Sequence, residues 1–217
     1  MLKLLKKEFA LCLHPTAIIF LCFAFIVFAP NYPYEVIFFF SGLSVFFTCL
    51  IARENGDLAF TCSLPVKKSF VALARILMVV IIQCTLLVMT AIAITVKQLT
   101  LPVEMLINQA GNSANIALLG FGAMILGAYN LTFFSLHFKD PQKVGVPFVI
   151  ASAVVFGLII ILIILRWTVP FFINLTVPDP ENIGAKIIIL AVGLCIYAAT
   201  TVCAARLSMK RFENVDF

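Results

Sequence analysis

Charged residues are scarce in this chain, and the common catalytic signatures are missing from it. Only 12% of its 217 residues are charged, whereas soluble domains average about 25%. The sequence has no GxxxxGK[ST] phosphate-binding loop, no HExxH zinc motif and no GxSxG nucleophile motif. We therefore expect no catalytic, cofactor-binding or metal-binding residues. If the protein carries out transport driven by a nucleotide, the ATPase must be another polypeptide.

Cysteine usage and net charge exclude two further classes. The seven cysteines are odd in number and show no CxxC spacing, so a disulfide framework and a zinc site are both disfavoured. Most of them fall in apolar stretches, where cysteine behaves as a small apolar side chain. The net charge of +5 comes without a basic stripe interleaved with aromatics, so nucleic acid is not an expected partner.

Long apolar runs dominate what is present. The chain is 63% hydrophobic, with a mean hydropathy of +1.15. A helix needs about 20 apolar residues to cross a bilayer, and continuous runs favour helices over the alternating strands of a barrel. We predict an all-α polytopic membrane protein, a single domain over residues 1–217, with six transmembrane helices at about Leu13–Ala29, Val36–Ala52, Phe70–Val96, Ala114–Phe138, Val144–Leu165 and Ala185–Ala205.

The basic residues predict the orientation in the membrane. Of the 15 Lys and Arg residues, 12 fall in the N-terminal segment, the second loop, the fourth loop and the C-terminal tail, which share one side of the predicted spans. The other side holds Lys97, Arg166 and Lys186. Because cytoplasmic loops are enriched in basic residues, we expect both termini in the cytoplasm and the protein in the cell (inner) membrane.

Two segments outside the spans have their own character. Residues 1–13 place Leu2, Leu5 and Phe9 at three- and four-residue spacing, with lysines on the opposite side. This predicts an amphipathic interfacial helix in contact with membrane lipid; the alternative is a charged tail without fixed structure. Residues 170–184 begin with an apolar run after Arg166 and Trp167, which favours a short interfacial or re-entrant element on the outer side.

Ionisable groups inside the spans would indicate an ion-coupled carrier. All ten acidic residues lie outside the predicted spans or at their edges, so this class is disfavoured. The milder polar and small residues within the spans would either line a path or pack helices together, and helix packing is the more common role. They are Gln83, Gly127, Tyr129, Asn130 and Tyr197.

The loop over residues 53–68 is the most specific segment. Its centre predicts a short helix with apolar Leu58, Phe60 and Leu64, and Pro65 ends helices at the preceding residue. Glu54 and Gly56, the run Ser63-Leu64-Pro65-Val66-Lys67-Lys68, and then Val71 and Arg75 resemble the first cytoplasmic loop of ABC-2-type permeases, the membrane subunits of ABC exporters. The N-terminal stretch Leu5-Lys6-Lys7-Glu8-Phe9 is similar to the interfacial connecting helix of that family, and the compact chain resembles permeases of phenol-soluble-modulin exporters most.

The resemblance implies a specific assembly. Two permease copies, identical or paralogous, would each dock a separate cytoplasmic ABC ATPase that holds ATP and magnesium. The segment Glu54–Leu64 would be the coupling helix, supported by Pro65, Lys67 and Lys68, and residues Phe171–Glu181 would match outer-leaflet helices. The cargo would be an amphipathic peptide or another hydrophobic molecule, exported between the two subunits.

A different class stays open. A membrane scaffold or sensor that docks a cytoplasmic partner without transporting anything would use the same basic loops. An ion-coupled carrier is the less favoured third reading because it lacks carboxylates within the spans.

Overall fold

The computed structural model describes residues 1–108 and 111–215, and their regular structure is helical apart from one isolated bridge between Ile107 and Ser113. The bounds of the helices follow in chain order: α1 Leu2–Lys7, η1 Glu8–Cys12 (π-helical), α2 Pro15–Leu21, η2 Cys22–Phe28 (3₁₀), α3 Val36–Glu54, α4 Asp57–Ser63, α5 Lys68–Thr100, η3 Val103–Met105 (3₁₀), α6 Ile116–His137, α7 Gly145–Thr168, α8 Pro170–Ile173 and α9 Ile183–Glu213.

Five helices are long and apolar enough to cross a membrane: α3, α5, α6, α7 and α9. They confirm five of the predicted spans. The first predicted span is less regular, because the helical segments Leu2–Cys12 and Pro15–Phe28 meet at an angle of 89° and qualify only as a pair. Half of Pro15–Phe28 is 3₁₀ helix, whose rise of about 2 Å per residue lengthens the segment to roughly 24 Å.

The bend between the two N-terminal segments has a local cause. Pro15 occupies the first helical position of α2, where its missing N–H costs no hydrogen bond. His14 is extended at the N-cap, and its Nδ1 accepts a hydrogen bond from the backbone N–H of Thr16 at 3.2 Å. A helix therefore starts anew at Pro15 rather than continuing from Cys12.

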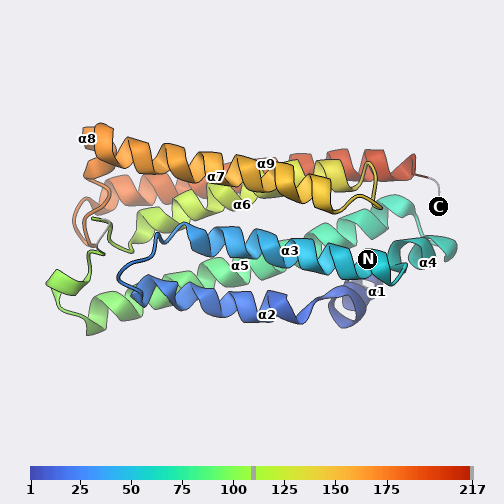
Figure 1. Cartoon of the computed structure of the whole chain (residues 1–217), viewed down its shortest axis with the longest axis horizontal. Coiled ribbons are helices and arrows are strands. Elements are labelled where there is room, and N and C mark those ends of the chain that lie inside the picture. The colour runs from blue at the N-terminus through green and yellow to red at the C-terminus, as the bar shows by residue number, and fades with distance from the viewer. Residues whose placement is uncertain (109–110, 216–217) are drawn as a thin grey trace.

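The helices form a bundle with two distinct ends (Figure 1). The N-terminus, α4 and the last turn of α9 lie at one end, which we call the terminal end. The connection between α5 and α6 lies at the other, the distal end, together with α8. The predicted element over residues 170–184 contains the four-residue helix α8 and the first two residues of α9. The irregular segment between them is held by Lys186, whose ammonium donates to the carbonyls of Val177 and Pro178.

Helix α6 is the core of the bundle. Of its apolar stretch 67% is buried, against 17% for α7. Helices α6 and α9 touch through glycines: a Cβ on Gly193 would lie 2.2 Å from the carbonyl oxygen of Gly120, and one on Gly120 would lie 2.5 Å from the carbonyl oxygen of Ile189. Gly127 likewise meets Tyr197 and Thr200. Gly127, one of the residues predicted either to line a path or to pack helices together, therefore packs helices inside the subunit.

We predict that Gly193→Ala destabilises the protein, because the new methyl group meets backbone atoms that cannot rotate away. Overpacking of this kind costs about 1–3 kcal/mol. Gly157→Ala is the matched control: it lies in the spanning helix α7 with nothing within 4 Å of its added Cβ, and alanine favours helix over glycine. Thermal unfolding in detergent should show a lower midpoint for Gly193→Ala alone; equal midpoints would contradict the close α6–α9 contact.

Candidate functional site

Helix α4 is a short helix with a non-helical residue at each end, Gly56 before it and Leu64 after it. Gly56 adopts a left-handed backbone with φ 62°, a conformation that glycine accepts without strain. Leu64 is extended at φ −79° and ψ 159°, as expected before Pro65. The helix therefore covers Asp57–Ser63, shorter than the implied Glu54–Leu64, and Glu54 is the last residue of α3.

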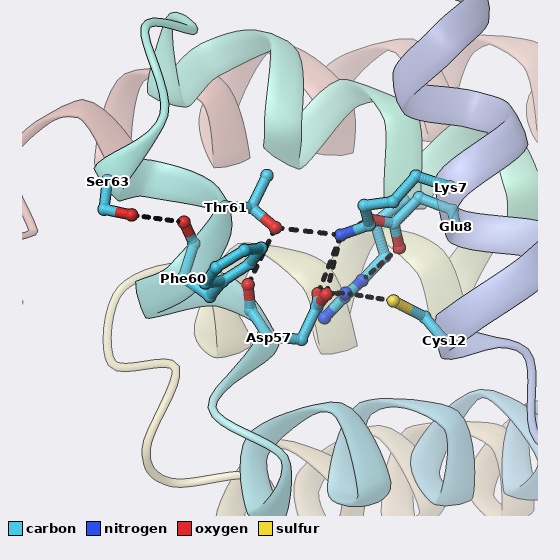
Figure 2. Close-up of polar contacts among 8 residues, drawn as sticks. Lys7, Glu8, Cys12, Asp57, Phe60, Thr61 and Ser63 are labelled. Atoms are coloured by element: carbon cyan, nitrogen blue, oxygen red, sulfur yellow. Dashed lines mark hydrogen bonds and ion pairs between the residues drawn. The ribbon is translucent and has the colours of Figure 1, made fainter.

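Four charged side chains meet behind α4, and we call them the charge cluster: Lys7, Glu8, Asp57 and Arg75. Figure 2 shows the side chains of α1, η1 and α4 converging. The Lys7 ammonium donates to both carboxylate oxygens of Asp57, at 2.8 and 2.9 Å, and to Thr61 Oγ1 at 3.0 Å. Arg75 donates from Nε to Glu8 Oε2 at 2.8 Å and from Nη2 to Asp57 Oδ2 at 2.6 Å. The cluster joins α1, η1, α4 and α5.

The cluster is buried and electrically balanced. The side chains of Arg75 and Glu8 are 0% and 1% exposed, and those of Asp57 and Lys7 are 12% and 18% exposed. Burial by itself would raise the pKa of Asp57, but the Lys7 hydrogen bond and the Arg75 charge outweigh it, so the pKa lies below its ordinary value. Two positive and two negative groups thus neutralise each other, and removing one would leave an uncompensated buried charge.

The Glu8 and Asp57 carboxylates and the Cys12 thiol lie within 4.8 Å of one another, a spacing that could suit a metal ion. The Arg75 guanidinium already contacts all three: its Nη2 lies 3.3 Å from Cys12 Sγ in addition to the two carboxylate contacts. The Lys7 ammonium adds a second positive charge. The arginine therefore takes the place that a cation would occupy.

The cluster was not predicted from the sequence. The acidic residues were expected outside the spans or at their edges, and at such positions Glu8 and Glu35 are buried, each 1% exposed and ion-paired with an arginine, Arg75 or Arg166. A signal was available: Arg75 lies about one and a half helical turns inside the predicted span that begins at Phe70, where a charged residue is expensive without a partner.

The predicted loop residues divide between the inside and the surface. Leu58 is 6% exposed and packs into the core of its own subunit, so it faces inward from the loop helix. Phe60 and Leu64 are 68% and 45% exposed. The other predicted positions on the surface of this loop are Glu54, Gly56, Pro65 and Lys67. Lys68 donates to the carbonyl oxygen of Val215 at 2.6 Å and ties α5 to the segment after α9.

The side chain of Leu11 and those of Leu2 and Phe9 lie on the exposed side of the N-terminal segment. Cys12 turns inward together with Glu8, and both side chains are buried. The π-helical turn shifts the register of the segment and places both side chains against Arg75. The N-terminal segment is therefore helical, but its buried side is polar.

The predicted polar residues of the spans form contacts between helices. The Gln83 and Asn130 amides exchange two hydrogen bonds of 2.8 Å, Tyr197 donates to Gln83 Oε1 at 2.8 Å, and Asn130 Nδ2 lies 3.2 Å from Thr201 Oγ1. These bonds join α5, α6 and α9. Tyr129 donates to the carbonyl oxygen of Gly42 at 2.7 Å and joins α6 to α3.

The bundle and its projecting loop helix define a multi-pass membrane protein with a small element suited to contact a partner at the terminal end. A family model described as ABC-2 family transporter protein matches residues 3–209. The chain therefore belongs to the ABC-2 family and is an ABC transporter permease, a kind of membrane subunit that associates with an ABC ATPase. No curated protein and no solved structure matches it.

We predict that Arg75→Met destabilises the protein by about 3–5 kcal/mol, because Glu8 and Asp57 keep buried negative charge without their arginine. The double variant Glu8→Gln with Arg75→Gln should recover much of the loss. Lys143→Met is the matched control, since its ion pair with Asp140 is 72% and 43% exposed and such pairs contribute little. Thermal unfolding in detergent measures all three; equal losses for Arg75→Met and Lys143→Met would contradict this role.

The lowered pKa of Asp57 predicts a pH dependence with a definite sign. Its ionised form is stabilised in the folded state, so its contribution is complete above the ordinary value of 3.8 and is lost as pH falls through the lower folded pKa. The melting temperature should exceed that of Asp57→Asn by a constant amount above about pH 5. The difference should shrink below pH 4; a difference that grows on acidification would contradict the pKa direction.

Proposed function

We propose that this permease is the membrane subunit of an ATP-driven exporter, and that α4 is the coupling helix seated in a groove of the ATPase subunit. The observation that supports this most is the exposed apolar face of α4. Phe60 on α4 and Leu64 directly after it are large apolar side chains that are 68% and 45% exposed. Apolar and aromatic anchors of this kind fill pockets at the centre of protein interfaces.

The charge cluster would transmit a movement of α4 to the transmembrane helix α5 and to the N-terminal segment. Asp57, the first residue of α4, is bound by Lys7 from α1 and by Arg75 from α5. A force on α4 therefore acts on a transmembrane helix and on the N-terminal segment together. Closure of the ATPase around ATP and magnesium would shift these elements as one body, in the manner of a rigid-body transition.

The orientation follows from charge. The four chain segments that lie at the terminal end hold 12 of the 15 Lys and Arg residues, and cytoplasmic segments carry such an excess. The terminal end then faces the cytoplasm of the cell membrane, where a soluble ATPase subunit can reach α4. The exposed Leu2 and Phe9 side chains would rest in the lipid headgroup layer.

The interior polar residues Gln83, Asn130 and Tyr197 are engaged with one another, which favours a path between two permease copies over one through a single subunit. The walls of such a path would be apolar, because α7 and α9 expose isoleucine and valine along their lengths. An amphipathic peptide or another hydrophobic molecule suits such walls.

We predict that Phe60→Asp combined with Leu64→Asp abolishes ATPase binding while membrane insertion is kept. Loss of one interface anchor costs about 2 kcal/mol or more, a roughly thirtyfold weakening. Val103→Asp is the matched control, because Val103 is equally exposed, at 70%, but lies between α5 and α6. Co-purification from gently solubilised membranes, read by mass spectrometry, measures binding; an ATPase retained by the double variant would contradict docking through α4.

A non-transporting scaffold or sensor would also use the exposed face of α4, so docking alone does not separate the two functions. ATP hydrolysis by the purified complex does. An exporter should hydrolyse ATP faster when an amphipathic peptide cargo is added, and the Arg75→Met complex should lose that stimulation. A scaffold should show none.

A further inference from the structure

A cavity of about 200 Å³ lies at the distal end, apart from α4 and the charge cluster. It opens between the end of α7, the segment that follows α8 and the start of the segment before α6. A second cavity of about 10 Å³, large enough for about one water molecule, shares three of its residues and also touches Glu35. The larger cavity is lined by Gly111, Asn112, Arg166, Trp167, Ile173 and Thr176.

Arg166 lines both cavities, and several of its N–H donors make no hydrogen bond within the part of the chain that the structure describes. Its side chain is 9% exposed, and Nη1 donates to Glu35 Oε1. A guanidinium has five N–H donors, and among the described residues only Nη1 of Arg166 makes a hydrogen bond. The Asn112 side-chain amide also makes none there, although its backbone N–H donates to Asn108 Oδ1. The larger cavity is thus lined by two sets of unused donors.

The rim of the larger cavity is apolar and exposed. Trp167 is 72% exposed and Ile173 is 44% exposed, and tryptophan concentrates at the headgroup level of bilayers. Farther along α7, the exposed side chains of Ile160, Ile161 and Ile164 continue in the direction of the bilayer centre. Donors beside an exposed apolar track suit a ligand with an anionic head and an acyl tail.

We propose that this cavity binds the phosphate group of a phospholipid, with Arg166 and Asn112 donating to the phosphate oxygens and an acyl chain lying along α7. The carboxylate of Glu35 offsets part of the Arg166 charge, which weakens binding of a small free anion. The acyl chain then supplies the remaining affinity, so the lipid is favoured over soluble phosphate. This site depends on the membrane location of the chain and not on docking of an ATPase.

The tryptophan on the rim is a built-in probe. Trp167 is the single tryptophan of the chain, so its fluorescence reports on the rim of this cavity and on no other part of the protein. The purified protein in maltoside detergent is titrated with phosphatidylglycerol carrying brominated acyl chains, which quench tryptophan on contact. Brominated diacylglycerol with the same chains is the control ligand. We expect the phospholipid to quench at an about tenfold lower mole fraction, the ratio expected from a charge-assisted hydrogen bond to phosphate.

Displacement distinguishes the lipid from a free anion. Unbrominated phosphatidylglycerol should restore the fluorescence, and glycerol phosphate should not. Equal quenching by the two brominated lipids would overturn the site, and displacement by glycerol phosphate at the same concentration would overturn the lipid assignment.

Two variants connect the effect to its residues. Asn112→Ala removes one donor set, and Arg166→Lys keeps a positive charge beside Glu35 while it removes the guanidinium. Both should lose most of the preference for phospholipid, with an unchanged emission maximum before lipid is added. Arg206→Gln, at an exposed position near the terminal end of α9, is the control and should keep the preference. Full preference in both cavity variants would overturn the proposal.

Discussion

A positive charge buried inside a membrane bundle must be neutralised, and the terminal end of this protein depends on that constraint. Arg75 is fully buried on α5. Its partners Glu8 and Asp57 lie in η1 and α4, and the helices α2, η2 and α3 separate these two elements along the chain. Lys7 restores the balance of charge. Moving any one of the four groups out of the cluster would leave an uncompensated buried charge. The helices α1, η1, α4 and α5 are therefore held in one arrangement.

The distal end obeys the same constraint with different residues. Lys97 donates to Tyr34 and to the carbonyl oxygen of Val27, Arg166 pairs with Glu35, and Lys186 pairs with Asp179. These are the three basic residues counted on that side of the membrane, and each is bound to another segment of the chain. Between the two ends, contacts of glycines and a small amide network join the helices, without a charged group. Ion pairs and hydrogen bonds of charged residues thus join the helices at both ends of the subunit, and close contacts at glycines join them in its middle.

Much of the architecture was predictable because long apolar runs admit few structures in a bilayer. Five of the six spans, the break at Pro65 and the short helix before it follow from composition and spacing. The bend before Pro15 and the π-helical turn were missed, since both depend on where Glu8 and Cys12 must point. The charge cluster was missed because its members are separated by up to 68 positions of sequence, and no local pattern joins them.

The sequence by itself determined that the chain spans a membrane, where five of the spanning helices lie and which loop resembles that of an ABC-2 permease. These properties are sums over neighbouring residues, such as hydropathy and basic charge, so they need no knowledge of the fold. Only the tertiary structure decided that Leu58 faces inward while Phe60 faces outward, that Arg75 fills a place resembling a metal site, and that Arg166 borders a cavity. Those outcomes depend on which residues that are distant in sequence come into contact in the fold. Sequence spacing does not specify these contacts, yet a buried charged group requires a partner of opposite charge.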